Sequence, residues 1–177
     1  MGGDFEGART FCYPGRGSDA SGTAAHAAFW REAEMAAGRL GIEAKAAGIH
    51  DAAETEQAIK ALSDKPLTTG LVALPHTVTE VNRDLIVALA TRYRLPSVHA
   101  FRAAPLAGAL ASYGVDPEDH VGRAADYVDR ILRGAKPSDL AVQAATKFEL
   151  VLNLKTAKAL GLAIPQSFVL RADQVIE

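Results

Sequence analysis

Short apolar runs alternate with helical patterns over the first hundred residues of the chain. Gly70–Leu74 is the clearest run, continuous and ended by Pro75, and it is typical of a parallel strand that is covered on both faces. Further strands are predicted over Arg9–Tyr13, Ile42–Ile49 and Leu95–Ala100. Between them, apolar residues three and four positions apart predict helices over about Ala25–Leu40, Ala52–Leu62 and Glu80–Tyr93. This order predicts an α/β fold in which helices flank both faces of a parallel sheet.

The pattern changes in the second half of the chain. Ala109–Gly114 reads as a strand of small residues that ends in a turn, and Pro117–Arg133 has the apolar spacing of a helix. Two more strand candidates, a short helix and a final strand-and-tail segment follow, at Leu140–Gln143, Phe148–Asn153, Lys155–Leu160 and after Pro165.

Single residues mark element ends and interior positions. Gly41 is expected to end the first helix, and Asp51 is placed to cap the second. Phe29 has the spacing of a core residue within the first helix. His99 lies inside a predicted strand, so we expect it in the core or at an interface.

Ligands of parallel α/β sheets bind beyond the carboxyl ends of the strands, which defines a predicted mouth here. Pro14–Ser18, Pro75–Thr79 and Phe101–Arg102 follow three such strand ends. We expect His76 or Thr77 to hydrogen-bond a ligand there, the alternative being a solvated loop histidine. The loop with Gly17 and Ser18 is expected to offer its amides and a hydroxyl to a polar ligand. A phosphate cradle or a flexible loop are the other interpretations, and the glycine patterns of known phosphate loops are absent.

Composition and charge exclude several classes of function. Apolar residues make up 49% of the 177 positions and charged residues 23%, an ordinary globular balance. The net charge is −2 and no dense block of Lys or Arg occurs, so nucleic acid is not an expected partner. Cys12 is the single cysteine, which rules out an intrachain disulfide. No histidine pair has helical metal spacing and no nucleophile elbow occurs. We therefore expect no catalytic residues, no metal and no cofactor, and a binder rather than an enzyme.

The second half resembles a known family. Thr146–Leu162, TKFELVLNLKTAKALGL, is similar to the carboxy-terminal signature of ABC transporter substrate-binding proteins, in the group of tryptophan- and tyrosine-type uptake binders. Supporting matches occur at Gly70–Pro75, Arg94–Pro96, Phe101–Arg102, Ser112–Gly114, Tyr127–Leu140 and Ile164–Ser167.

The resemblance implies two Rossmann-like lobes of the type I periplasmic-binding-protein kind, joined by crossover strands and closing at a hinge. Residues 1–8 are then a disordered or tag-like start, and residues 9–107 the second lobe. Residues 108–147 form a hinge strand and a helix that belongs to a missing first lobe. Residues 148–177 form the return strand, a helix and the tail.

The expected ligand is a small organic solute such as an amino acid. The binding residues predicted from the mouth and the hinge are Tyr13, Gly17, Ser18, His76, Thr77, Phe101, Ser112 and Tyr113. Family members commonly place an acidic or amide residue and an aromatic where this chain has His76 and Thr77, so the identity of the solute stays open.

Partners and location follow from the same resemblance. An ABC transporter permease is the implied partner, and the periplasm is the implied compartment. Residues 1–7 lack the basic end and apolar run of a secretory signal, so we expect a cytoplasmic protein if the chain is complete. The apolar stripe of Pro117–Arg133 predicts a homodimer, a domain-swapped pair or repacking of this helix. A cytoplasmic dimeric sensor or regulator is the alternative function, and a flavodoxin-like enzyme is a third.

Overall fold

The computed structural model describes residues 10–13, 24–49, 51–63 and 69–177. Within these residues one seven-stranded sheet has the order β2-β1-β3-β4-β5-β6-β7. Its strands are β1 (Thr10–Tyr13), β2 (Ala46–Gly48), β3 (Leu71–Ala73), β4 (Ser97–His99), β5 (Ala111–Val115), β6 (Phe148–Asn153) and β7 (Gln174–Ile176). The first five strands in that order are parallel, β6 is antiparallel to β5, and β7 is parallel to β6. The predicted α/β fold with a mainly parallel sheet is confirmed.

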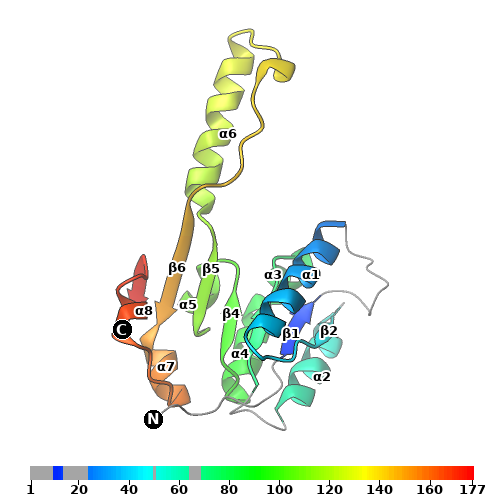
Figure 1. Ribbon diagram of the computed structural model, residues 1–177, viewed down its shortest axis with the longest axis vertical. Helices are drawn as coiled ribbons and strands as arrows, with labels where there is room; N and C mark the ends of the chain where they lie inside the picture. Colours follow the sequence, from blue (N-terminus) through cyan, green and yellow to red (C-terminus); the bar gives the residue numbers. More distant parts are fainter. Residues whose placement is uncertain (1–9, 14–23, 50, 64–68) are drawn as a thin grey trace.

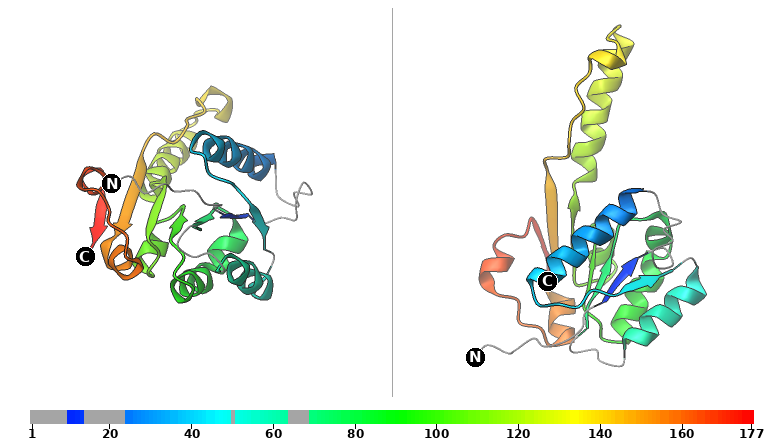
Figure 2. Two further views of the ribbon diagram at one scale, coloured as in Figure 1. Left: turned by 60° about the horizontal axis from the view of Figure 1, so that its bottom comes forward. Right: turned by 45° about the vertical axis from the view of Figure 1, so that its right-hand side comes forward.

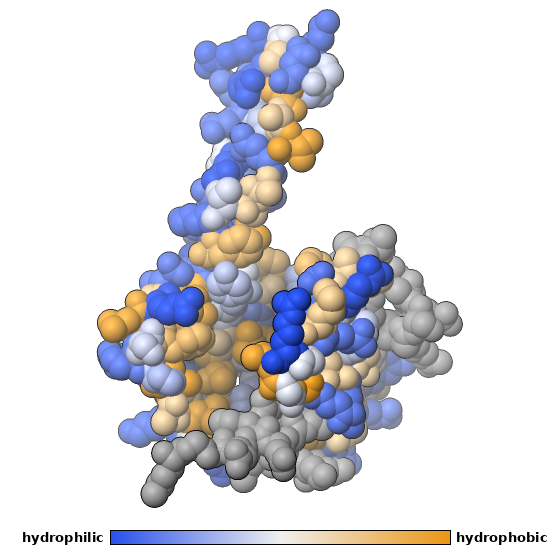
Figure 3. All heavy atoms as spheres, viewed as in Figure 1, coloured by the Kyte–Doolittle hydropathy of each residue, from blue (hydrophilic) through white to orange (hydrophobic). Residues whose placement is uncertain are grey.

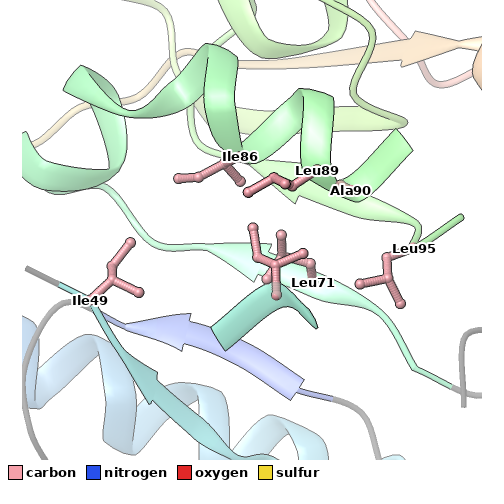
Figure 4. Packing of buried hydrophobic residues seen from close by; sticks show 7 residues of the cluster. Ile49, Leu71, Ile86, Leu89, Ala90 and Leu95 are labelled. Atoms are coloured by element: carbon pink, nitrogen blue, oxygen red, sulfur yellow. The ribbon is translucent and has the colours of Figure 1, made fainter. Parts of the chain in front are cut away.

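Helices cover both faces of the parallel part of the sheet. Helix α1 (Ala24–Arg39) lies over one face, and α2 (Ala52–Leu62) and α4 (Arg83–Arg92) lie over the other (Figure 2). The main core cluster forms between the sheet and the α2–α4 layer, where β-branched and leucine side chains interdigitate (Figure 4). Its buried members are Ile49, Ile59, Leu71, Ile86, Leu89, Ala90 and Leu95.

Two local signals act as the sequence predicts. The Asp51 side chain accepts a 2.8 Å hydrogen bond from the backbone N–H of Glu54 and caps α2, which starts and ends at the predicted residues. Gly41, two residues beyond α1, has a φ of +65°, a left-handed conformation that glycine adopts without a steric penalty.

The second half of the chain leaves the body of the molecule and returns (Figure 1). Strand β5 leads into helix α6 (Pro117–Leu132), which stands away from the sheet and has no buried residue. After the 3-10 turn η1 (Pro137–Asp139), an extended segment runs back along α6 to β6. Helices α7 (Leu154–Leu160) and α8 (Gln166–Val169) then precede β7, and α5 (Ala103–Leu106) fills the β4–β5 connection.

Three expectations are corrected. Leu140–Gln143 forms no strand, because it runs beside a helix and no neighbouring strand pairs with it among the described residues. The helix expected over Glu80–Tyr93 is two helices, α3 (Thr77–Val81) and α4, with a break at Asn82. Phe29, expected in the core, is 45% exposed.

No helix of the described residues has the length and apolar character needed to cross a membrane.

Candidate functional site

A hollow of about 490 Å³ lies where α6 meets the sheet. We call it the hinge hollow. Apolar surface gathers at the base of α6 in Figure 3, where this hollow opens. Its walls come from the carboxyl ends of β3, β4 and β5, from α1, from the first turn of α6 and from the first residue of β6. The lining residues are Phe29, Pro75, Ala100, Phe101, Tyr113, Gly114, Val115, Pro117, His120, Val121 and Phe148.

Two aromatic rings form one wall of the hinge hollow. Tyr113 of β5 and Phe148 of β6 are stacked, with ring centroids 5.7 Å apart and an interplanar angle of 17°. In the antiparallel register Tyr113 pairs with Leu150 and Val115 pairs with Phe148. Because alternate residues of a strand point to opposite faces, Tyr113, Val115 and Phe148 share one face of this ribbon. Both rings are substantially exposed, and they give the hollow a flat aromatic surface that is open to a ligand.

The hinge hollow sits directly above the point where the two chain segments separate. The last β5–β6 pair is Val115 with Phe148, and the next contact is a 3.1 Å hydrogen bond from the Asp116 N–H to the Lys147 carbonyl. The Asp116 carboxylate caps α6 by accepting from the N–H groups of Glu118 and Asp119, and it pairs with the Lys147 ammonium at 2.6 Å. The hydrogen bond from Lys147 and those from the helix backbone hold the pKa of Asp116 below its usual range. This carboxylate stays ionised and fixes the start of α6.

His76 and Thr77 lie beside the hinge hollow, next to its lining residue Pro75. The imidazole of His76 caps α3, because its Nδ1 accepts a 3.0 Å hydrogen bond from the N–H of Val78. The Thr79 hydroxyl accepts from the His76 N–H at 3.1 Å and donates to the Leu74 carbonyl at 2.8 Å. His76 therefore has a structural contact of its own at the predicted mouth, while Thr77 is exposed.

The other predicted site residues divide into three groups. Phe101 and Tyr113 line the hinge hollow. Ser112 is 1% exposed, lies in the sheet between His99 and Val151, and is not among the lining residues. Tyr13 ends β1, and the structure describes only its backbone. Gly17 and Ser18 lie outside the described residues.

Sequence reasoning missed several lining residues. Phe29 has core spacing on α1, yet it faces the hollow, because periodicity identifies a face without saying what covers it. Phe148, His120 and Val121 join the site only through the antiparallel return of β6 and the position of α6. The one available signal was the place of Phe148 at the start of a predicted crossover strand.

A buried histidine lies in the sheet near the hinge hollow. His99 is 3% exposed, and its Nε2 has no hydrogen-bond partner among the described residues. Burial, and then the positive charge of Arg83, lower the pKa of His99 to about 4. His99 is therefore neutral at physiological pH and belongs to the interior rather than to the hollow.

The chemistry of the hinge hollow is that of an apolar binding surface. Four aromatic rings, two prolines and two valines supply its lining, and His120 supplies an imidazole. Such a surface binds an apolar or aromatic group by burying it, while polar groups at the rim fix its orientation. No group of three or more His, Cys, Asp or Glu side chains able to hold a metal ion occurs within the described ranges.

The sequence and the fold both match known proteins. The family model of ABC transporter substrate-binding proteins matches residues 20–176. No curated protein matches the chain significantly. A conserved domain protein from Vibrio cholerae is 26% identical and superposes with a TM-score of 0.81, over 95% of this chain and 54% of that one.

Two further solved structures share the fold. The ABC domain from Streptococcus pneumoniae in complex with L-Trp is 21% identical, with a TM-score of 0.81 over 96% of this chain and 56% of that one. A substrate-binding protein with adhesive properties from Clostridium difficile, in its ligand-free open structure, is 19% identical, with a TM-score of 0.65 over 97% and 54%. This chain thus spans little more than half the length of each of these three proteins. Because the family model covers most of the chain, the protein belongs to the family of ABC transporter substrate-binding proteins.

Proposed function

We propose that the hinge hollow receives the apolar or aromatic part of a small organic solute, such as an aromatic amino acid, for an ABC-type uptake transporter. The observation that carries the proposal is the stacked Tyr113–Phe148 wall, with Phe101 beside it at the carboxyl end of β4. A flat aromatic wall favours a planar ligand group, because stacking adds to the gain from burying the ring. One structural relative was solved with L-Trp bound, which supports the same class of ligand.

The polar end of the solute is assigned to the other predicted residues. His76 and Thr77 lie at the rim beside Pro75, and Tyr13, Gly17 and Ser18 belong to the β1 end of the predicted mouth. Backbone amides and hydroxyls of this kind orient an amino acid through its ammonium and carboxylate groups. Ser112 takes the role of a buried support for the ribbon in this proposal, since its side chain is enclosed in the sheet.

The test is a thermal-shift titration of the whole chain with L-tryptophan, L-leucine and L-serine. A ligand that binds only the folded state raises the midpoint in proportion to the logarithm of its concentration. We expect a rise with L-tryptophan, a smaller rise with L-leucine and none with L-serine. The variant Phe101→Ala should lose most of the L-tryptophan shift. Stabilisation by nucleotides alone would contradict the proposal.

The domain division is also proposed. Residues 9–107 act as the second lobe, residues 108–147 supply a hinge strand and a helix that packs on a first lobe, and residues 148–177 return to the second lobe. The exposed position of α6 supports this division (Figure 1). The transporter permease as partner and the periplasm as compartment follow from family membership and stand as proposals. Secretion of a tagged chain from its natural gene tests the compartment, and retention in the cytoplasm would favour a sensor or regulator.

Where no first lobe covers it, the apolar face of α6 is proposed to pair with a second copy of the chain. Val121, Val128 and Leu132 recur at helical spacing on α6 and are 69%, 55% and 81% exposed. Such a stripe gains free energy when another surface covers it. Light scattering after gel filtration should give the mass of a dimer, and Val128→Lys with Leu132→Lys should give a monomer. A monomeric wild-type chain would contradict the pairing.

A further inference from the structure

The β5–β6 ribbon has two chemically different faces at the hinge. Tyr113 and Phe148 lie on the face of the hinge hollow, and the alternation of strand residues places Gly114 and Glu149 on the opposite face. Gly114 and Glu149 are partners in the register, so on this second face a carboxylate lies beside a position that has no side chain. The Glu149 side chain is 19% exposed.

Arg102 contacts this second face from the body of the molecule. It follows Phe101, a lining residue of the hollow, and its backbone is held at the start of α5. The Phe101 carbonyl accepts from the Ala104 N–H at 3.1 Å, and the Arg102 carbonyl accepts from the Leu106 N–H at 3.3 Å. The base of the Arg102 side chain is therefore fixed to the sheet rather than to α6.

The guanidinium of Arg102 reaches both segments of the hinge. It donates a hydrogen bond to the Glu118 carboxylate, and its second terminal nitrogen lies 3.7 Å from the Glu149 carboxylate. Glu149 is inside the β5–β6 ladder, whereas Glu118 is on the first turn of α6, beyond the last ladder pair. A rotation of α6 about Asp116 changes the Arg102–Glu118 distance and leaves the Arg102–Glu149 distance nearly unchanged.

Because of the charges around the guanidinium, removal of Arg102 would disfavour the present orientation of α6. Glu118 and Glu149 are both acidic and share Arg102, while Asp116 is paired with Lys147 and Asp119 with Arg123. Its hydrogen bond to Glu118, and then the charge of that carboxylate and of Glu149, raise the pKa of Arg102. Without Arg102, two carboxylates on adjoining segments would repel each other, which favours moving α6 away.

We propose that Arg102 is a positioning residue, a latch whose ion pair with Glu118 selects one orientation of α6 relative to the sheet. Pro117, His120 and Val121 of α6 form one wall of the hinge hollow and Phe101 forms another, so this orientation sets the width of the hollow. Because Arg102 directly follows Phe101, the latch links the position of this lining residue to the orientation of α6. It does so from the face of the ribbon opposite to the hinge hollow. Only the step from the hinge angle to ligand affinity rests on the proposed function.

The test measures the hinge without any ligand. Spin labels are attached to Ala88→Cys on α4 and Asp126→Cys on α6, both exposed positions, in a Cys12→Ser background. The labelled chain is diluted with unlabelled chain so that only distances within one molecule are recorded. Pulsed electron resonance then gives the distribution of distances between α4 and α6.

Arg102→Gln and Glu118→Gln should lower the population of the wild-type distance by about two- to fivefold relative to other distances, as an ion pair of limited burial allows. Arg102→Lys should retain most of the population at the wild-type distance. In the wild type, 1 M salt should lower this population as Arg102→Gln does, because charges are then screened within about 3 Å. Glu149→Gln should lower the population of the wild-type distance less than Glu118→Gln does. Arg133→Gln, which removes a similar pair with Asp129 within α6, is the matched control and should change nothing.

An unchanged distribution in Arg102→Gln overturns the latch, and so does an effect of Glu149→Gln as large as that of Glu118→Gln. Folding of each variant is checked by circular dichroism. The thermal-shift titration with L-tryptophan on the same variants separates the two proposals. A changed distance distribution in a chain that binds no amino acid leaves the latch standing and removes the proposed function. Unchanged distances in a chain that does bind remove only the latch.

Discussion

Gly114 lies against the backbone of Ala100 so closely that a β-carbon on Gly114 would fall 2.1 Å from the Ala100 carbonyl oxygen. No side chain fits there, and the obstacle is backbone rather than the end of a flexible side chain. This contact seats β5 on the turn after β4, directly beside Phe101 and Arg102. The approach of these two backbones determines how the ribbon leaves the sheet.

Replacement of this glycine should be costly. Gly114→Ala should lower the free energy of unfolding by about 1–3 kcal/mol, the usual range for forcing atoms into a filled site. Gly122→Ala on exposed α6 is the matched control, because nothing lies within 4 Å of the added carbon. It should leave the free energy unchanged or raise it by up to about 1 kcal/mol through helix propensity. Urea unfolding followed by circular dichroism measures both variants, and equal effects of the two would refute the close contact.

The stability of the fold should depend on pH through His99. Its pKa is lowered to about 4 in the folded protein, whereas an unfolded histidine titrates near about 6.5. Between these values the unfolded chain binds more protons, so the free energy of unfolding falls as the pH falls through this window. Across the whole window, protonation of the unfolded chain lowers the free energy of unfolding by about 3 kcal/mol.

Chemical unfolding at a series of pH values from 7.5 to about 4 tests this linkage. His99→Leu should flatten the dependence in that window, because the variant has nothing to protonate at the site. A wild-type slope in His99→Leu would assign the dependence to other groups.

Asn153 ties the return strand to α5 and should be a strong stabilising residue. Its side-chain oxygen caps α7 by accepting from the Thr156 N–H at 2.9 Å, and its amide donates to the buried Pro105 carbonyl at 2.9 Å. Asn153→Ala removes both and should cost about 2–4 kcal/mol, the sum of a cap and an orphaned buried carbonyl. Asp51→Ala removes only the exposed cap of α2 and should cost about 1 kcal/mol. Thermal unfolding of the two variants compares them, and equal losses would show that the Pro105 contact contributes nothing.

The aromatic wall should matter more for binding than for folding. Phe148 is 45% exposed, so Phe148→Ala should change the free energy of unfolding by less than about 1.5 kcal/mol. The same variant should remove at least half of the L-tryptophan thermal shift, since it takes away one of the two stacked rings. Phe168→Ala on α8 is the control, because Phe168 is 42% exposed and lies outside the hinge hollow. A full shift in Phe148→Ala would place the ligand elsewhere.

Local chemistry made much of the parallel sheet predictable. The Asp51 cap, the Gly41 stop and the run at Gly70–Leu74 are short-range signals, and the elements they mark appear where they predict. The carboxyl ends of the strands likewise gave Phe101 as a site residue. These features depend on periods of two or 3.6 residues and on caps, which one stretch of chain carries by itself.

The site beyond those strand ends depends on long-range pairing. The stack of Tyr113 on Phe148 and the approach of Arg102 to Glu149 exist because β6 returns antiparallel to β5, and no local pattern specifies that register. The break at Asn82 was also missed, because the capping by His76 and Thr79 starts α3 before the apolar pattern of α4 begins. The misjudged exposure of Phe29 has the same origin, since what covers a helix face is decided by distant segments.

The two faces of the β5–β6 ribbon have a consequence for how such a protein can change over generations. Tyr113 and Phe148 can be exchanged for other side chains without altering Gly114 or Glu149, because neighbouring positions along each strand point in opposite directions. A lineage can therefore acquire a preference for a new solute while its hinge keeps the same mechanics. The reverse also holds, so that the angle between α6 and the sheet is adjustable by charge while the ligand stays the same.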